Sequence, residues 1–246
     1  MTDRRTFLVA SLIPMLSSVN VSAQADVDQT FVDLKFPPFG AIGAPETFGY
    51  EPATAAQRQK ALEMINQAPM GPKAIDIAQY FIDKYAQNDS ELISQWPAPA
   101  NWNPLVVDFF SATTTRANND MIAWCAAFAN WCLERNGRPG TKNAASQSFL
   151  DAKGFNRMAE PKVGDLAVFT CYDLSGKTMG LGHVAFVKTP PESGHVVLVG
   201  GNTSSGGHSS TICEKEFSTG STKTSRTVGN KRVPCVMRLN TYIQVL

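Results

Sequence analysis

The stretch that decides the fold is WCAAF at residues 124–128, within the longer run DMIAWCAAFANWCL at residues 120–133. Its apolar residues recur with helical spacing, so we expect a helix that begins close to Trp124 and ends at Asn136-Gly137, where the glycine caps the C-terminus. Cys125 then lies at the N-terminal end of this helix. The helix dipole and the unpaired N–H groups there lower the pKa of a thiol towards that of a reactive thiolate.

The chain changes along its length from helical patterns to short apolar runs separated by Gly, Pro and Ser turns. Besides the helix at residue 124, the spacing predicts helices over residues 55–66, 73–87 (with Pro72 suited to its first turn) and 105–110, and one from Thr141 to Lys153-Gly154. Strands are predicted over residues 163–170, 182–188, 195–200 and 233–239. Helices followed by strands indicate an α+β domain, in which a helix packs on one face of an antiparallel sheet.

Residues 1–25 are predicted to be a signal peptide. Arg4 and Arg5 precede an apolar run at residues 7–16 that is too short to span a bilayer. The small residues of Ala23-Gln24-Ala25 fit signal-peptidase cleavage before residue 26. The arginine pair is similar to a twin-arginine export signal, with an ordinary Sec signal as the alternative. We therefore expect export to a bacterial periplasm.

About 220 residues remain after signal removal, which is enough for one domain with its own core. Residues 26–73 are expected to form an extended and partly helical N-terminal extension, and residues 74–246 the domain itself. The net charge is +1, without a long run of either sign. Neither nucleic acid nor an anionic membrane face is therefore an expected partner, and no integral membrane segment is expected after signal removal.

Five cysteines are present, an odd number in a chain expected to enter an oxidising compartment, so at least one should stay unpaired. The four other than Cys125 allow three connectivities: Cys132, Cys171, Cys213 and Cys235. Pairing of Cys213 with Cys235 is favoured because both lie in the strand-rich C-terminal part. No cysteine or histidine spacing matches a zinc site, and no metal or other cofactor is expected.

A reactive cysteine needs a base, and the chain has only three histidines. His183 opens the strand pattern HVAFV, where alternation directs it to the same sheet face as Ala185 and Val187. The preceding glycine permits a close approach of another group. We interpret Cys125 and His183 as a nucleophile and its base.

A third polar group should hold the imidazole in its tautomer. Asn202, at the end of VVLVGGN, is favoured for this role, and His195 is the alternative third residue. Trp124 is expected to form a wall of the substrate cleft. Asp120 is expected either to cap the helix or to line the same cleft.

Four ordered motifs, DMIAWCAAFANWCL, GDLAVF at residues 164–169, GHVAFV at 182–187 and VGGN at 199–202, resemble the CHAP and NlpC/P60 superfamily. The similarity runs from about residue 74 to the C-terminus. It implies a papain-like fold with Cys125 as nucleophile, His183 as base and Asn202 as orienting residue. It also implies a cysteine peptidase or amidase that cleaves amide bonds in peptidoglycan, as an endopeptidase or an N-acetylmuramoyl-L-alanine amidase. Some family members have a histidine as the third residue.

Two other functions remain open from the sequence. The domain could be a non-catalytic module that binds cell wall or a protein partner, with Cys125 and His183 as core residues. It could also be an antibacterial amidase effector that uses the same thioester chemistry. The sequence does not indicate which amide bond is cleaved, the role of residues 26–73, or the oligomeric state.

Overall fold

The computed structural model describes residues 53–96, 102–117, 119–205, 208–228 and 231–245. The predicted signal peptide and most of the predicted extension lie outside these residues. The helical part comes first and contains α1 (Ala55–Gln67), α2 (Ala74–Tyr85), η3 (Ser90–Ile93), α3 (Pro104–Phe109), η4 (Phe110–Ala112), α4 (Cys125–Arg135) and α5 (Ser148–Asp151). None of the helices in the described part of the chain is long and apolar enough to cross a membrane.

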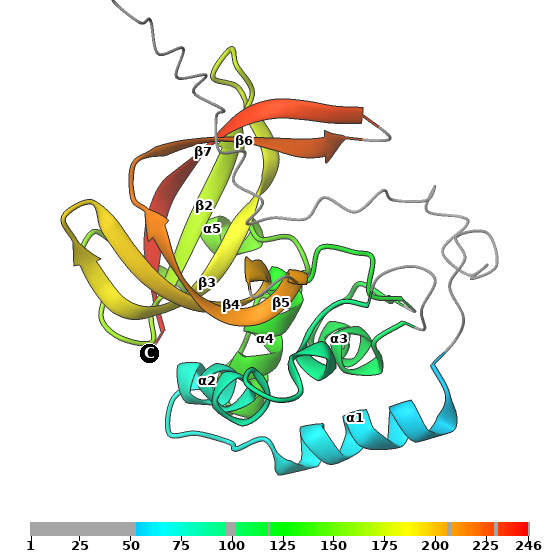
Figure 1. Cartoon of the computed structure of the whole chain (residues 1–246). Helices are drawn as coiled ribbons and strands as arrows, with labels where there is room; N and C mark the ends of the chain where they lie inside the picture. Colours follow the sequence, from blue (N-terminus) through cyan, green and yellow to red (C-terminus); the bar gives the residue numbers. More distant parts are fainter. Residues whose placement is uncertain (1–52, 97–101, 118, 206–207, 229–230, 246) are drawn as a thin grey trace, which may run out of the picture.

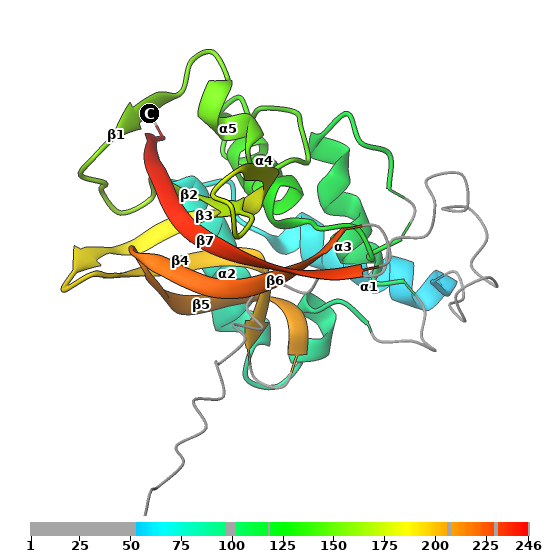
Figure 2. The ribbon, with the colours of Figure 1, turned by 90° about the horizontal axis from the view of Figure 1, so that it is seen from above.

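One antiparallel sheet follows the helices (Figure 1). Its strands are β1 (Asn156–Met158), β2 (Leu166–Tyr172), β3 (Thr178–Glu192), β4 (His195–Ser205), β5 (His208–Ser218), β6 (Ser221–Val228) and β7 (Lys231–Gln244). The order across the sheet is β1-β7-β2-β3-β4-β5, and β6 pairs with β7. Because β6 follows β5 after a short turn yet pairs near the other end of this order, the sheet is curved, as Figure 2 shows. The predicted α+β class is therefore confirmed.

Two hydrophobic clusters lie on the two faces of the sheet. The larger cluster contains residues of helices α1, α2, α3 and α4, packed against residues of the sheet such as Val184 and Phe186 of β3. The smaller one lies on the other face and contains Ala185 and Val187 of the same strand. Alternation along β3 therefore separates the two faces, as expected for a strand buried on both sides.

Helix α4 lies between the sheet and the other helices (Figure 1). All its residues from 125 to 133 are buried, so it has no solvent-exposed face along this length. It ends at Arg135, and Gly137 has a φ of 75° with its N–H bonded to the Glu134 carbonyl. The predicted helix and its glycine cap are thus confirmed.

The structure corrects two local predictions and contains three strands for which no prediction was made. Pro72 precedes the N-cap residue Lys73, so it is not in the first turn of α2. The helix expected from Thr141 is limited to α5, because Asn130 of α4 accepts hydrogen bonds from the backbone N–H groups of Thr141 and Lys142 and holds this segment as a loop. Strands β1, β5 and β6 were not predicted.

Candidate active site

Cys125 is the first residue of α4, and Trp124 is its N-cap residue. The Cys125 side chain is only 4% exposed, and this burial raises its pKa above the usual value of 9.0. Hydrogen bonds from the backbone N–H groups of Val184 and Ala126 and the positive charge of Arg226 act in the opposite direction. In this closed arrangement the thiol is therefore protonated at neutral pH.

His183 lies on β3, directly before Val184, and is fully buried. Its ring stacks on Phe217 with 5.6 Å between centroids, and its Nε2 lies 3.4 Å from Thr203 Oγ1. Phe217 belongs to the smaller cluster, which confirms that His183 shares a face with Ala185 and Val187. Burial, followed by the charges of Arg226 and Lys215, lowers the pKa of His183 well below 6.5. The imidazole is neutral at pH 7, as a general base must be.

The hydrogen bond from the Val184 N–H places the Cys125 sulfur beside the residue that follows His183. The nucleophile candidate comes from a helix on one face of the sheet, and the imidazole belongs to the other face. The two meet at the backbone of β3. The start of α4 and the strand of His183, which are 58 positions apart in the sequence, are thus in contact through the Val184 backbone.

Asn202 precedes Thr203, but the hydrogen bond of its own side chain is with Ser210. Ser210 Oγ donates to Asn202 Oδ1 at 2.8 Å, and Trp124 Nε1 donates to Ser210 Oγ at 3.0 Å. Asn202 has a φ of 60°, in the left-handed region that asparagine tolerates better than most residues. The neighbouring residue, Thr203, contacts the imidazole instead.

A β-bulge in β4 explains why the side chains of Asn202 and Thr203 have different partners. Gly200 pairs with Cys213 and Thr203 with Thr211, so two residues of β4 lie opposite one residue of β5. Gly201 faces Trp124, whose ring leaves no room for a Cβ atom. In a regular strand, residues 201 and 203 would share a face. The extra residue turns Thr203 to the face of His183.

Trp124 and Asp120 were expected in the wall of the substrate cleft, but both are fully buried. Asp120 is not a helix cap; its Oδ2 accepts the backbone N–H groups of Trp96 and Asn103, at 3.1 and 2.9 Å. Burial raises the pKa of Asp120 to about 6 despite these bonds. Trp124 and Asp120 are therefore core residues and do not form the surface of a cleft.

His195, the alternative third residue, lies at the opposite end of β4 from Asn202. It is exposed and its Nδ1 is 3.2 Å from the Ser193 carbonyl oxygen. Seven residues of strand correspond to about 23 Å. The structure therefore places Asn202, and not His195, in a chain of hydrogen bonds that reaches Trp124, next to Cys125.

Arg226 of β6 is a functional candidate that the sequence reasoning missed. It is 2% exposed, and its Nε lies 3.3 Å from Cys171 Sγ in the smaller cluster. Its charge acts on the pKa of both Cys125 and His183. The surrounding sequence STKTSRTV has no apolar alternation, so nothing local indicates a buried strand there.

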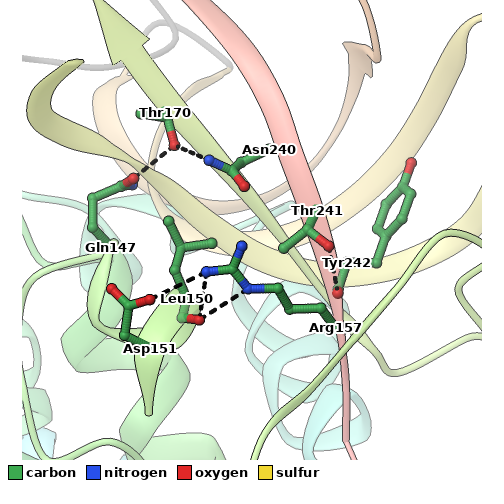
Figure 3. A network of polar contacts seen from close by, with 8 residues as sticks. All are labelled: Gln147, Leu150, Asp151, Arg157, Thr170, Asn240, Thr241 and Tyr242. Carbon is green, nitrogen blue, oxygen red and sulfur yellow. Dashed lines mark hydrogen bonds and ion pairs between the residues drawn. The ribbon is translucent and has the colours of Figure 1, made fainter. Parts of the chain in front are cut away.

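A polar network joins Gln147, the N-cap residue of α5, to β2 and β7 (Figure 3). Gln147 donates to the Phe169 carbonyl at 2.8 Å and accepts from Thr170 Oγ1 at 2.7 Å, and Asn240 of β7 donates to the same Thr170 hydroxyl. A Cβ atom at Gly182 would lie 1.9 Å from the Phe169 carbonyl oxygen. Glycine is therefore needed before His183 because β2 and Gln147 occupy the space of a side chain.

The five cysteines are all buried and none of them forms a disulfide bond, so the predicted Cys213–Cys235 disulfide is wrong. Cys213 lies opposite Gly200 of β4, whereas Cys235 lies opposite Thr224 of β6. The two are on strands that do not pair with each other. Within the described ranges, no group of three or more His, Cys, Asp or Glu residues could hold a metal ion.

Residues 117–214 match the family model of the CHAP domain. This segment contains Cys125, His183 and Asn202, and it extends from just before α4 into β5. The match is consistent with a CHAP/NlpC/P60-type cysteine peptidase-like protein. Such domains are typically amidohydrolases that depend on a cysteine and a histidine, and they suggest hydrolysis of peptidoglycan. No curated protein and no solved structure matches the chain.

Proposed function

We propose that this protein is an exported cysteine hydrolase that cleaves amide bonds in peptidoglycan, as an endopeptidase or as an N-acetylmuramoyl-L-alanine amidase. The observation that carries the proposal is the hydrogen bond between Cys125 and the backbone of Val184, because it joins the helix N-terminus to the strand of His183. The CHAP match adds the substrate class. The predicted signal peptide adds the location, which is the periplasm.

The proposed reaction is acyl transfer through a thioester. The Cys125 thiol gives its proton to His183, and the sulfur attacks the amide carbonyl carbon to form a C–S bond and an oxyanion. Collapse of this intermediate breaks the C–N bond, and the imidazolium protonates the leaving amine. Water, deprotonated by His183, then breaks the C–S bond, which releases the acid and restores the thiol.

The charge states at the site support this order of events. Burial favours the neutral form of both Cys125 and His183, so the resting pair carries no charge. The proton therefore moves as the substrate binds, and the thiolate forms next to the Val184 and Ala126 N–H groups and the Arg226 charge. The backbone N–H of Cys125, at the helix start, is suited to bind the oxyanion.

Access to the thiol requires local movement. Cys125 is only 4% exposed and His183 is fully buried. A peptide stem can contact the sulfur only after the groups that cover it move, as is common in enzymes whose closed state excludes water. The same burial favours the second candidate function, a non-catalytic wall-binding module in which both residues are core residues.

The two functions are separated by incubation of peptidoglycan sacculi with the mature protein, followed by mass spectrometry of the soluble fragments. Cys125→Ala, which removes only the thiol, is the matched control, and Cys132→Ala tests a buried cysteine later in the same helix. Fragments from the wild type and from Cys132→Ala, but not from Cys125→Ala, are expected, and their masses identify the bond. Sacculi that bind the protein without release of fragments would support the binding module.

Export is tested separately in cells. A reporter that is active only after transport, fused after residue 25, should require both Arg4 and Arg5 if the twin-arginine route is used. Replacement of both arginines by lysine retains the positive charge and tests the pair itself. Transport that continues in the lysine variant would indicate the Sec route, and no transport in either form would overturn the periplasmic location.

A further inference from the structure

The contacts of His183 and Asn202 assign different roles from those that the motif order suggests. The ring nitrogen Nε2 of His183 is directed at the Thr203 hydroxyl, at 3.4 Å, and Thr203 is itself buried. A hydroxyl oxygen can accept the Nε2 proton. With that proton on Nε2, the lone pair that can accept a proton is on Nδ1.

The carboxamide of Asn202 is oriented by a chain of two hydrogen bonds. An indole N–H can only donate, so the bond from Trp124 Nε1 makes Ser210 Oγ the acceptor. The hydroxyl proton of Ser210 is then available for Asn202 Oδ1, at 2.8 Å. The acceptor atom of the carboxamide is thus directed at Ser210, and its NH2 group is directed elsewhere.

This chain of hydrogen bonds ends at Trp124, next to the nucleophile candidate Cys125. Trp124 precedes Cys125 in the sequence, and it packs so tightly against Gly201 that this part of β4 is held at the start of α4. The three side chains that these hydrogen bonds connect are all buried: Trp124, Ser210 and Asn202. An oxyanion on a carbonyl attacked by Cys125 needs two or more donors near the helix start. A fixed NH2 group on Asn202 has the chemistry of the second donor.

We propose that Thr203 is the positioning residue of His183, and that Trp124 and Ser210 orient Asn202 as a hydrogen-bond donor to the oxyanion. The inference rests on the proposed cysteine hydrolase function and deepens it. Asn202 is then a catalytic residue, whereas Thr203 acts through the imidazole. The third member of the triad is then the hydroxyl of Thr203 and not the carboxamide of Asn202. A hydroxyl stabilises an imidazolium less strongly than a carboxylate does.

Two kinds of measurement separate these roles. Alkylation of Cys125 by iodoacetamide depends on proton transfer to His183 but forms no oxyanion, whereas release of peptidoglycan fragments requires both. Peptide mapping by mass spectrometry follows Cys125 apart from the other four cysteines. Each rate is measured from about pH 5 to 9 on variants whose thermal unfolding shows that they remain folded.

Thr203→Val removes the hydroxyl and retains the shape. We expect it to slow both alkylation and fragment release, by on the order of 10-fold, and to move the pH profile of alkylation; loss of a stronger, carboxylate partner costs about 10⁴-fold in serine proteases. Thr203→Ser retains the hydroxyl and should restore most of both rates. A purely structural role would not give rescue by serine together with a shifted pH profile.

Asn202→Gly tolerates the positive φ and removes the carboxamide. We expect fragment release to fall about 10²–10³-fold, as for loss of an oxyanion donor, with the alkylation rate and its pH profile unchanged within about twofold. Ser210→Ala should give a smaller loss of the same kind. The inference is overturned if Asn202→Gly moves the alkylation profile while Thr203→Val does not, because Asn202 would then orient His183.

Failure of the proposed function looks different. If wild-type Cys125 is not alkylated in the folded protein and no fragments are released, the hydrolase proposal itself fails. If the wild type releases fragments but Thr203→Val and Asn202→Gly behave like the wild type in both assays, only the assignment of roles is wrong.

Discussion

Replacement of Gly201 by alanine tests the contact between β4 and the start of α4. An alanine Cβ would lie 2.1 Å from Cζ3 of Trp124, whereas carbon atoms pack best at about 3.5–4.0 Å. The ring or the strand must therefore move by more than about 1 Å. The ring is fully buried and contacts Phe109 and Phe128, and its Nε1 is bonded to Ser210, so it has little freedom to move.

The expected cost is at the upper end of that for overpacked cores, about 3 kcal/mol in the free energy of unfolding. With a urea dependence of about 2 kcal/mol per molar, the midpoint of unfolding should fall by about 1.5 M. Gly220→Ala is the matched control, because the nearest atom to its added Cβ, Ser218 Oγ, is at an ordinary 3.5 Å. That variant should stay within about 0.5 kcal/mol of the wild type.

A double-mutant cycle identifies the contact. Trp124→Leu removes the ring atoms that meet the new methyl group, so Gly201→Ala should cost about 1 kcal/mol or less in that background. An equal cost of Gly201→Ala with and without the indole ring would refute this explanation. So would a Gly201→Ala variant as stable as Gly220→Ala, since the close approach would then not exist.

Three further predictions concern charge and sulfur. The folded-state pKa of Asp120 is raised to about 6 from 3.8, so protonation of Asp120 stabilises the folded state at low pH, and this stabilisation is lost as the pH rises through 6. It amounts to about 3 kcal/mol in the free energy of unfolding. Urea unfolding curves from pH 4 to 8 should show that Asp120→Asn flattens this pH dependence. Arg226→Gln should slow alkylation of Cys125 at pH 7 about 3–10-fold, because the thiolate loses a nearby positive charge. Arg226→Lys retains the charge and should retain most of the rate. An equal effect from Arg232→Gln, at an exposed residue, would contradict a local role of Arg226. Unfolded, unreduced protein should titrate five thiols with a thiol reagent, and a count of three or fewer would show that a disulfide forms.

The parts of the fold that the sequence predicts are those governed by local patterns. Helix α4 follows from apolar spacing and from Gly137, and both are properties of neighbouring residues. The same holds for α1 and for the apolar strands β2 and β3. By contrast, β6 has no apolar alternation, and its pairing with β7 depends on residues that come later in the chain.

The candidate site shows the same division. Cys125 and His183 are candidates from the motifs alone because each lies in a distinctive short pattern, whereas the hydrogen bond from the Val184 backbone to Cys125 is seen only in the structure. The direction of Thr203 depends on one extra residue in a strand, which leaves no local signal in GGNTSS. The position of Arg226 depends on a hairpin that follows the matched family segment, so the motif comparison could not include it.

Strand β7 has a consequence for any attempt to isolate this domain. It lies between β2 on one side and β1 and β6 on the other, yet it begins at residue 231, after the CHAP match ends at 214. A fragment cut at the family boundary would leave the whole edge of β2 unpaired, with Phe169 and Cys171 of the smaller cluster uncovered. Such an edge recruits strands from other molecules. The shorter polypeptide would therefore aggregate, and a fusion partner or a truncation point should be placed beyond residue 244.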